Sequence, residues 1–342
     1  YQLRFTSVKL SNNALNFLLA QYRAIFKRAY VKGLAAAVIV TAGMAAGQAQ
    51  AAPDYYFWDY SSAWTTKTDA AASDGLVAGV IGGNNVGSYT ETVVSGGNLT
   101  IGGGSSSALS GVTSGSAVAG WGSAKTGDLT VQNNTITITG NGTVTKDGED
   151  ERGFVYGGWV QSLAGKAAAN DNHVIISGKT DKKAAASDGL LGAYVEGHLG
   201  ASATGNTIEV SGSASNLQVI STSGTSTAIG AQIMPFKSGE VTATGDFTAN
   251  QNQVSLDYVT VSTDAEDDVV NIFGANFGAN FGDPTKADAT KTTLSAQGNI
   301  VTLSNAEIDT ASGSIGNILG ATHENTFGGN INFNANEVKL SD

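Results

Sequence analysis

The chain has 342 residues, of which 45 are glycine, 3 are proline and none is cysteine, and its formal net charge is −11. The lack of cysteine excludes zinc-finger clusters, thiol nucleophiles and disulfide bonds, and it suits export through an oxidising compartment. With 41% hydrophobic residues the chain can bury a core, and its glycine-rich, proline-poor composition is typical of short strands joined by tight turns. The acidic charge predicts a surface that repels nucleic acid and anionic lipid.

The first 51 residues have the pattern of a secretory signal peptide with an N-terminal extension. A basic stretch that ends at Lys32 is followed by the apolar run Leu34–Ala46, and a small-x-small pattern predicts cleavage after Ala51. The apolar run is shorter than the ~20 residues of a membrane-spanning helix, so we expect a cleaved helical signal rather than an anchor. This segment holds six basic and no acidic residues, so cleavage takes the net charge from −11 to −17.

An aromatic-rich tract follows the predicted cleavage site. Residues 54–60 include three tyrosines together with Phe57 and Trp58, and Trp64 lies nearby. Because the open end of a repeat array needs covering, we predict that residues 52–75 form an N-terminal cap. The alternative is that these aromatic rings bind sugar.

Two sequence signals alternate from residue 76 to the last residue. One is an apolar segment that contains glycine, as in Val118–Trp121 and Leu191–Tyr194. The other is the unit Asn-x-apolar-x-apolar, which recurs at intervals of 34 to 47 residues. This unit begins at Asn134, Asn172, Asn206, Asn252, Asn299 and Asn336. A fixed alternation of this kind indicates internal structural repeats.

The alternation of apolar and polar residues within each unit predicts half-buried strands. Each repeat then supplies at least two short strands, which cannot close a core alone and must stack on their neighbours. The uneven spacing argues against a propeller, whose blades are similar in length. We therefore predict an all-β fold, an elongated right-handed parallel β-helix (β-solenoid) with irregular repeats over residues 76–342.

The recurring asparagines have two candidate structural roles. Equivalent Asn side chains of stacked repeats can hydrogen-bond to one another and to turn backbone, forming a ladder. Alternatively, Asn recurs because it tolerates left-handed turn geometry. The glycines of the other segment are expected at sharp corners or bulges. Both signals are structural, and we predict no catalytic, cofactor-binding or metal-binding residue.

A family resemblance rests on Tyr156–Trp159, which is Tyr-Gly-Gly-Trp, and on Asn172–Gly178, which is Asn-His-Val-Ile-Ile-Ser-Gly. This combination resembles the passenger repeats of autotransporters, the type V secretion proteins of Gram-negative bacteria, over about residues 76–342. The resemblance implies export by a signal peptide and passage across the outer membrane through a C-terminal β-barrel. The sequence contains no such barrel, so we expect the chain to be a fragment.

Motifs that carry chemistry are sparse. The chain has three histidines, His173, His198 and His323, and no Gly-x-Ser-x-Gly elbow that would favour a catalytic triad. His173 occupies a polar strand position and is expected to face solvent. Gly178–Thr180 resembles the end of a phosphate-binding loop, but the first glycine of that motif would fall on His173.

Two acidic clusters, residues 147–151 and 264–268, are predicted to be solvated loops. Weak calcium binding is the alternative, although neither cluster has the ligand spacing of the known calcium loops. Stacked loops could also bring distant carboxylates together in a catalytic groove for polysaccharide.

These patterns predict a surface-exposed, autotransporter-like passenger that acts in adhesion, aggregation or surface display, without catalysis and without a cofactor. Its expected partners are glycans or proteins of host or bacterial surfaces, or a second copy of itself, and not nucleic acid. Its expected location is the cell surface or outer membrane of a Gram-negative bacterium, or the extracellular space. The alternative function is a secreted β-helical enzyme that acts on polysaccharide.

Overall fold

The structure is a computed structural model, and the chain divides into two units, residues 1–49 and 50–342. All described residues belong to the second unit, so the predicted signal segment lies outside them. The described residues are 55–342 apart from the segments 60–62, 68–70, 74, 86–89, 104–108, 114, 146–152, 180–188, 223–227, 237–243, 264–267, 279–291, 310–312 and 325–328.

The described residues form strands and no helix, which confirms the all-β prediction. Most strands belong to three large sheets. Sheet 1 contains, in spatial order, β2 (Thr65–Lys67), β1 (Tyr55–Trp58), β4 (Leu76–Gly82), β8 (Ser116–Ala124), β12 (Phe154–Ser162), β15 (Gly189–Gly197), β19 (Ala228–Pro235), β23 (Val269–Phe277) and β27 (Ser314–His323).

Sheets 2 and 3 have seven strands each. Sheet 2 contains β5 (Val93–Ser95), β9 (Leu129–Gln132), β13 (Ala167–Asn170), β16 (Ala201–Thr204), β20 (Gly245–Asn250), β24 (Thr292–Gln297) and β28 (Asn330–Asn334). Sheet 3 contains β6 (Asn98–Gly102), β10 (Thr135–Gly140), β14 (His173–Lys179), β17 (Thr207–Ser211), β21 (Gln253–Asp257), β25 (Ile300–Ser304) and β29 (Glu337–Ser341).

Two three-stranded sheets complete the architecture. One contains β3 (Ala71–Ser73), β7 (Gly111–Thr113) and β11 (Val144–Thr145), and the other contains β18 (Gln218–Thr222), β22 (Val259–Thr263) and β26 (Glu307–Asp309). The repeat that contains Lys179 lies between these two small sheets. The buried Lys179 ammonium donates a hydrogen bond to the Gly142 carbonyl in the preceding repeat, and the Lys179 carbonyl accepts one from Asn216 in the following repeat.

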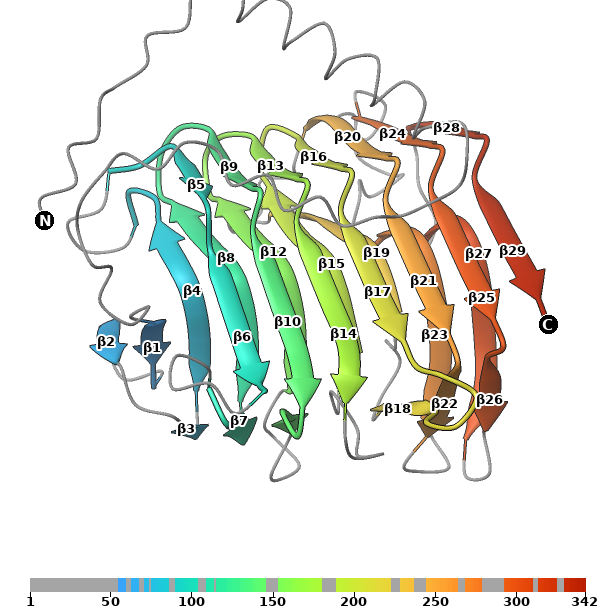
Figure 1. Cartoon of the computed structure of the whole chain (residues 1–342). Coiled ribbons are helices and arrows are strands. Elements are labelled where there is room, and N and C mark those ends of the chain that lie inside the picture. The colour runs from blue at the N-terminus through green and yellow to red at the C-terminus, as the bar shows by residue number, and fades with distance from the viewer. Residues whose placement is uncertain are drawn as a thin grey trace, which may run out of the picture. The chain divides into compact units, whose positions relative to one another are not determined.

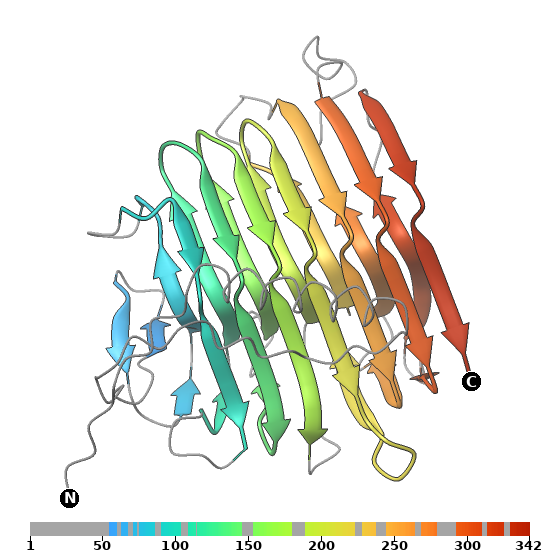
Figure 2. The same cartoon turned by 45° about the horizontal axis from the view of Figure 1, so that its top comes forward.

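Every repeat passes through sheets 1, 2 and 3 in that order, so equivalent strands of successive repeats lie side by side (Figure 1). Within sheet 3, for example, Ile136 pairs with Leu99 of the preceding repeat and with Val174 of the following one. The pairing is parallel in all three sheets except at β1, which pairs antiparallel with β2 and β4. The same in-order arrangement is visible from a second direction (Figure 2).

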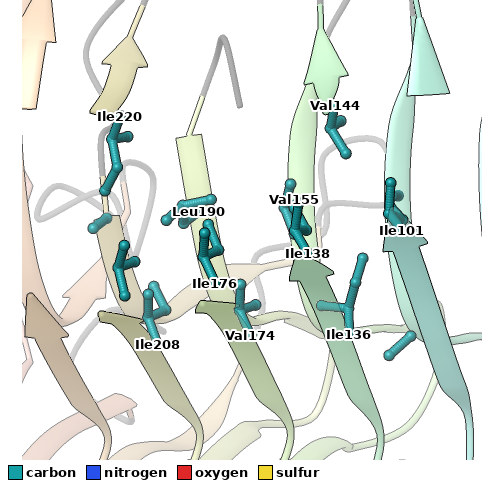
Figure 3. Close-up of a cluster of buried hydrophobic side chains, with 14 of the residues drawn as sticks. Ile101, Ile136, Ile138, Val144, Val155, Val174, Ile176, Leu190, Ile208 and Ile220 are labelled. Atoms are coloured by element: carbon teal, nitrogen blue, oxygen red, sulfur yellow. The ribbon is translucent and has the colours of Figure 1, made fainter. Parts of the chain in front are cut away.

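In-register stacking lines up like side chains and fills the interior with columns of aliphatic residues. One buried cluster includes Ile101, Ile138 and Ile176, which extend from sheet 3 toward sheet 1 (Figure 3). A second cluster includes Val131, Val195 and Phe247, between sheets 2 and 1. Because full burial of an aliphatic side chain contributes about 1.5–3 kcal/mol, these columns are a main source of stability.

Candidate functional site

The six recurring asparagines line up at the corner between sheets 2 and 3. The Nδ2 of each of the first five donates to Oδ1 of the equivalent Asn in the next repeat, over 2.8–2.9 Å. From Asn206 onward, each Oδ1 also accepts a hydrogen bond from the backbone N–H of the preceding ladder Asn, over 3.0–3.2 Å. We call this column the Asn ladder; its members are Asn134, Asn172, Asn206, Asn252, Asn299 and Asn336.

The ladder satisfies buried amide groups that would otherwise be costly. The second Nδ2 hydrogen of Asn252, for example, is donated to the Ala203 carbonyl over 3.1 Å, so its amide makes two donor and two acceptor bonds. The Asn252 side chain is fully buried, and an unsatisfied buried group costs about 1–3 kcal/mol. In the first repeat Gly97 occupies the ladder position, and its backbone N–H donates to Asn134 over 2.8 Å.

The left-handed residue at this corner is the one before the ladder Asn. Its φ lies between 51° and 79° in all seven repeats, at Gly96, Asn133, Asp171, Gly205, Gln251, Gly298 and Ala335. No ladder Asn itself has a positive φ. Of the two roles considered for the recurring Asn, these contacts correspond to the ladder and not to the tolerance of left-handed geometry.

A glycine column in sheet 1 lies opposite the Asn ladder. Parallel pairing in sheet 1 skips one residue in every repeat, at Gly79, Ala119, Gly157, Gly192, Gly230, Gly274 and Gly320. A Cβ on Gly157 would lie 2.5 Å from the Gly192 carbonyl oxygen and 2.9 Å from the backbone nitrogen of His173. The next residue, Gly158, faces Asn172, where a Cβ would approach the side-chain Cγ to 2.8 Å. The two sequence signals therefore alternate because their backbones pack against each other.

The skipped residue changes which side chains reach the outer face of sheet 1. In β12 the side chains of Val155 and Val160 point into the two interior clusters. Tyr156 and Trp159, three residues apart, both belong to a third cluster that is separate from the interior. Trp159 pairs in register with Trp121 on one side and with Tyr194 on the other.

A polar row accompanies these three aromatic residues, two positions further along the same strands. Ser123, Gln161 and Glu196 are register partners. Gln161 donates to the Glu196 carboxylate over 2.7 Å, and the Tyr194 hydroxyl donates to its other oxygen over 2.8 Å. We call Trp121, Trp159 and Tyr194 with Ser123, Gln161 and Glu196 the aromatic platform. The sequence placed the aromatic residues at equivalent repeat positions, but it did not show that they face outward.

The aromatic tract after the predicted cleavage site extends this face. Tyr55 and Phe57 of β1 are buried in the interior cluster, while Tyr56 and Trp58 pack on the outer cluster. Trp64 joins the tract to the platform, with its ring centroid 5.8 Å from Trp58 and 5.0 Å from Trp121. Since β1 covers the edge of β4 by antiparallel pairing, the geometry suits the predicted cap, whose necessity for folding stays a prediction.

The histidines occupy structural surroundings. His173 was expected to face solvent; it alternates with buried strand residues and so points outward, but it is half-buried. Its Nδ1 lies 2.8 Å from the hydroxyl of Thr207, its register partner on the neighbouring strand. Burial lowers the pKa of His173, and the nearby Asp171 and Glu209 carboxylates partly oppose that shift. His198 Nδ1 contacts the Phe236 carbonyl at 3.5 Å, and the ring of His323 packs against Phe333. Within the described ranges, none of the three imidazoles hydrogen-bonds to a Ser or a carboxylate.

The other candidate motifs lie partly outside the described residues. Cluster 147–151 and most of cluster 264–268 are not described, but Asp268 is buried, which corrects the prediction of a solvated loop at that position. In Gly178–Thr180 the lysine is buried in the structural contact with Gly142, as described above, and Thr180 is not described. No group of three or more His, Asp or Glu side chains with metal-binding geometry occurs in the described part of the chain.

No helix among the described residues is long and apolar enough to cross a membrane. Comparison of the chain with protein-family models, with curated proteins and with solved structures finds no match.

Proposed function

We propose that the seven repeats form a right-handed parallel β-helix that is exported and acts at the bacterial surface in adhesion, aggregation or display, without catalysis. Parallel sheets whose strands follow one another through sheets 1, 2 and 3 support the solenoid. Crossovers between parallel strands of one sheet are right-handed in about 98% of cases, which supports the handedness. The resemblance of the repeats to autotransporter passengers supports the location.

One observation carries the function: in-register aliphatic columns and a hydrogen-bonded Asn ladder fill the interior of the repeats. A filled, hydrogen-bonded interior makes the described part of the repeats rigid and leaves no room there for a ligand, so partners would bind on the outer faces. A rigid array with a broad outer surface suits binding and display.

The test is to produce the full chain, with its native flanking gene sequence, in a Gram-negative host. We expect protease and antibody to reach the repeats on intact cells, and we expect these cells to aggregate or to adhere to surfaces more than cells with empty vector. Retention of the protein inside the cell would contradict the proposal. Release of reducing ends from polysaccharides by the purified protein would instead favour the enzymatic alternative.

A further inference from the structure

All four tryptophans of the chain belong to one cluster on the outer face of sheet 1, whereas the interior is filled mainly by Val, Ile, Leu and Ala. Tryptophan is the residue type that gives the largest contact area at a binding surface. Trp121 and Trp159 are only partly buried, so part of each ring is accessible. This concentration outside the core points to a ligand.

The strand spacing of the aromatic platform matches the size of one unit in a polymer of pyranose rings. Trp121, Trp159 and Tyr194 stand in register on adjacent parallel strands, which are about 4.8 Å apart. A pyranose ring has a similar width and presents C–H groups that pack on aromatic faces. The Trp159 and Tyr194 rings stand edge to face, with centroids 5.5 Å apart and planes at 73°. The three rings therefore provide successive apolar contacts along the direction in which the repeats are stacked, and not one flat surface.

The polar row provides the hydrogen bonds that sugar hydroxyls need. Each oxygen of the Glu196 carboxylate accepts one hydrogen bond, from Gln161 or from Tyr194, and retains capacity for another. The Gln161 carbonyl has a contact of 3.4 Å from the Ser123 hydroxyl and also retains capacity. These acceptors lie two residues from the stacking positions on the same strands.

Charge and backbone pairing narrow the class of ligand. The platform contains one carboxylate and no Lys or Arg, and the chain carries a net charge of −11, so an anionic polysaccharide would be repelled. A peptide could not add here as a strand, because β8, β12 and β15 are central strands with neighbours on both sides. A neutral glycan fits both conditions.

We propose that the aromatic platform binds a neutral oligosaccharide chain, laid across β8, β12 and β15. The inference deepens the proposed surface function, on which it rests, by naming a partner class and the residues that bind it. Trp121, Trp159 and Tyr194 contact the C–H groups of successive sugar rings, and Gln161 and Glu196 accept hydrogen bonds from the sugar hydroxyls.

The test uses the purified full chain, titrated with cellohexaose, xylohexaose and mannohexaose, with tryptophan fluorescence and calorimetry as readouts. We expect at least one of these neutral probes to bind and to change the fluorescence, and we expect polygalacturonate not to bind. Trp159→Ala and Glu196→Gln should each weaken binding at least about tenfold. Thr322→Ala is the matched control, because Thr322 lies in the same register column at the far end of sheet 1, and it should bind like the unchanged protein.

Failure of all three neutral probes to bind at concentrations up to about 10 mM would overturn the inference. So would unchanged affinity in Trp159→Ala, or binding of a basic peptide such as oligolysine at the platform in place of sugar. Melting curves show whether each variant is folded, and Glu196→Gln tests the site without removing a packed ring. Adhesion of intact cells together with no glycan binding would overturn this inference and leave the proposed function standing.

Discussion

The connection between sheets 2 and 3 is constant in length, whereas the connection between sheets 1 and 2 varies in length from repeat to repeat. Two residues connect sheet 2 to sheet 3 in all seven repeats, with a left-handed residue first and the ladder position second. Between sheets 1 and 2 the connection varies from three residues, between β15 and β16, to fourteen, between β23 and β24. The uneven repeat length is thus accommodated away from the Asn ladder.

The difference shows where this chain tolerates insertions. The ladder corner is fixed because each amide must meet acceptors and donors in both neighbouring repeats, and one added residue would move it out of reach. The variable corners carry no such column of side-chain hydrogen bonds among the described residues. Connections that vary in length are where the binding specificity of a protein usually resides.

The most severe way to break the fixed corner is Asn252→Ala. This change removes the buried acceptor of the Asn206 backbone N–H and of one Asn206 Nδ2 hydrogen. It also removes the side-chain donor to the Ala203 carbonyl. We expect a loss of about 3 kcal/mol or more of unfolding free energy, measured by urea denaturation. Asn250→Ala, two residues away and half-buried, should cost less than about 0.5 kcal/mol; equal losses in the two variants would refute the role of the ladder.

A second substitution, in sheet 1, disturbs the backbone that packs against the corner between sheets 2 and 3. Gly157→Ala places a Cβ 2.5 Å from the Gly192 carbonyl oxygen, so the backbone must shift at the contact with the corner. We expect a loss of about 1–3 kcal/mol, read from the thermal midpoint. The control is Gly111→Ala, where the nearest atom is 3.4 Å from the new Cβ; a comparable loss there would show that glycine content alone, and not this contact, matters.

A milder change tests the left-handed residue of the corner. Gly298 has a φ of 66°, and a Cβ there would meet nothing closer than 3.8 Å, so space is not the constraint. Gly298→Val should cost about 1–2 kcal/mol through backbone strain, measured by urea denaturation. Gly298→Asn should lose clearly less, and identical stability of the two variants would contradict the strain explanation.

The smallest expected effect is a change of stability with pH that arises at the corner between sheets 2 and 3. Burial lowers the pKa of His173, just after the ladder corner, from its ordinary value of 6.5. The unfolded chain therefore binds the proton more readily than the folded chain, so stability is full above pH 6.5 and declines as the pH falls from there toward the lowered pKa. Melting between pH 7.5 and 5 should show this decline in the unchanged protein and a weaker one in His173→Gln; parallel curves would contradict it.

Much of the repeat organisation could be predicted from the sequence, because Asn-x-apolar-x-apolar and the glycine segments mark the strands of sheets 3 and 1. The strands of sheet 2 carry a weaker signal, as in Ala167–Asn170, which is Ala-Ala-Ala-Asn and lacks β-branched residues. The left-handed position is occupied by Gly, Asn, Asp, Gln or Ala in different repeats, so the residue type alone does not locate this corner in the sequence.

The aromatic platform could not be predicted because its orientation depends on one skipped residue. Strict alternation from Val155 would place Tyr156 and Trp159 on opposite faces, whereas the break at Gly157 places both outside. His173 occupies the outward strand position that was expected, but it is only partly exposed, because Thr207 on the neighbouring strand contacts its ring and is distant in sequence.

The Asn ladder also gives the stack an electrical direction. Every Nδ2–H···Oδ1 bond runs from one repeat to the next in chain order, so the amide dipoles align head to tail. In a buried, low-dielectric environment, aligned hydrogen bonds polarise one another and strengthen by about 10–30% per bond. An amide in the middle of the column therefore has a polarising amide on both sides, whereas an amide at either end of the ladder has only one.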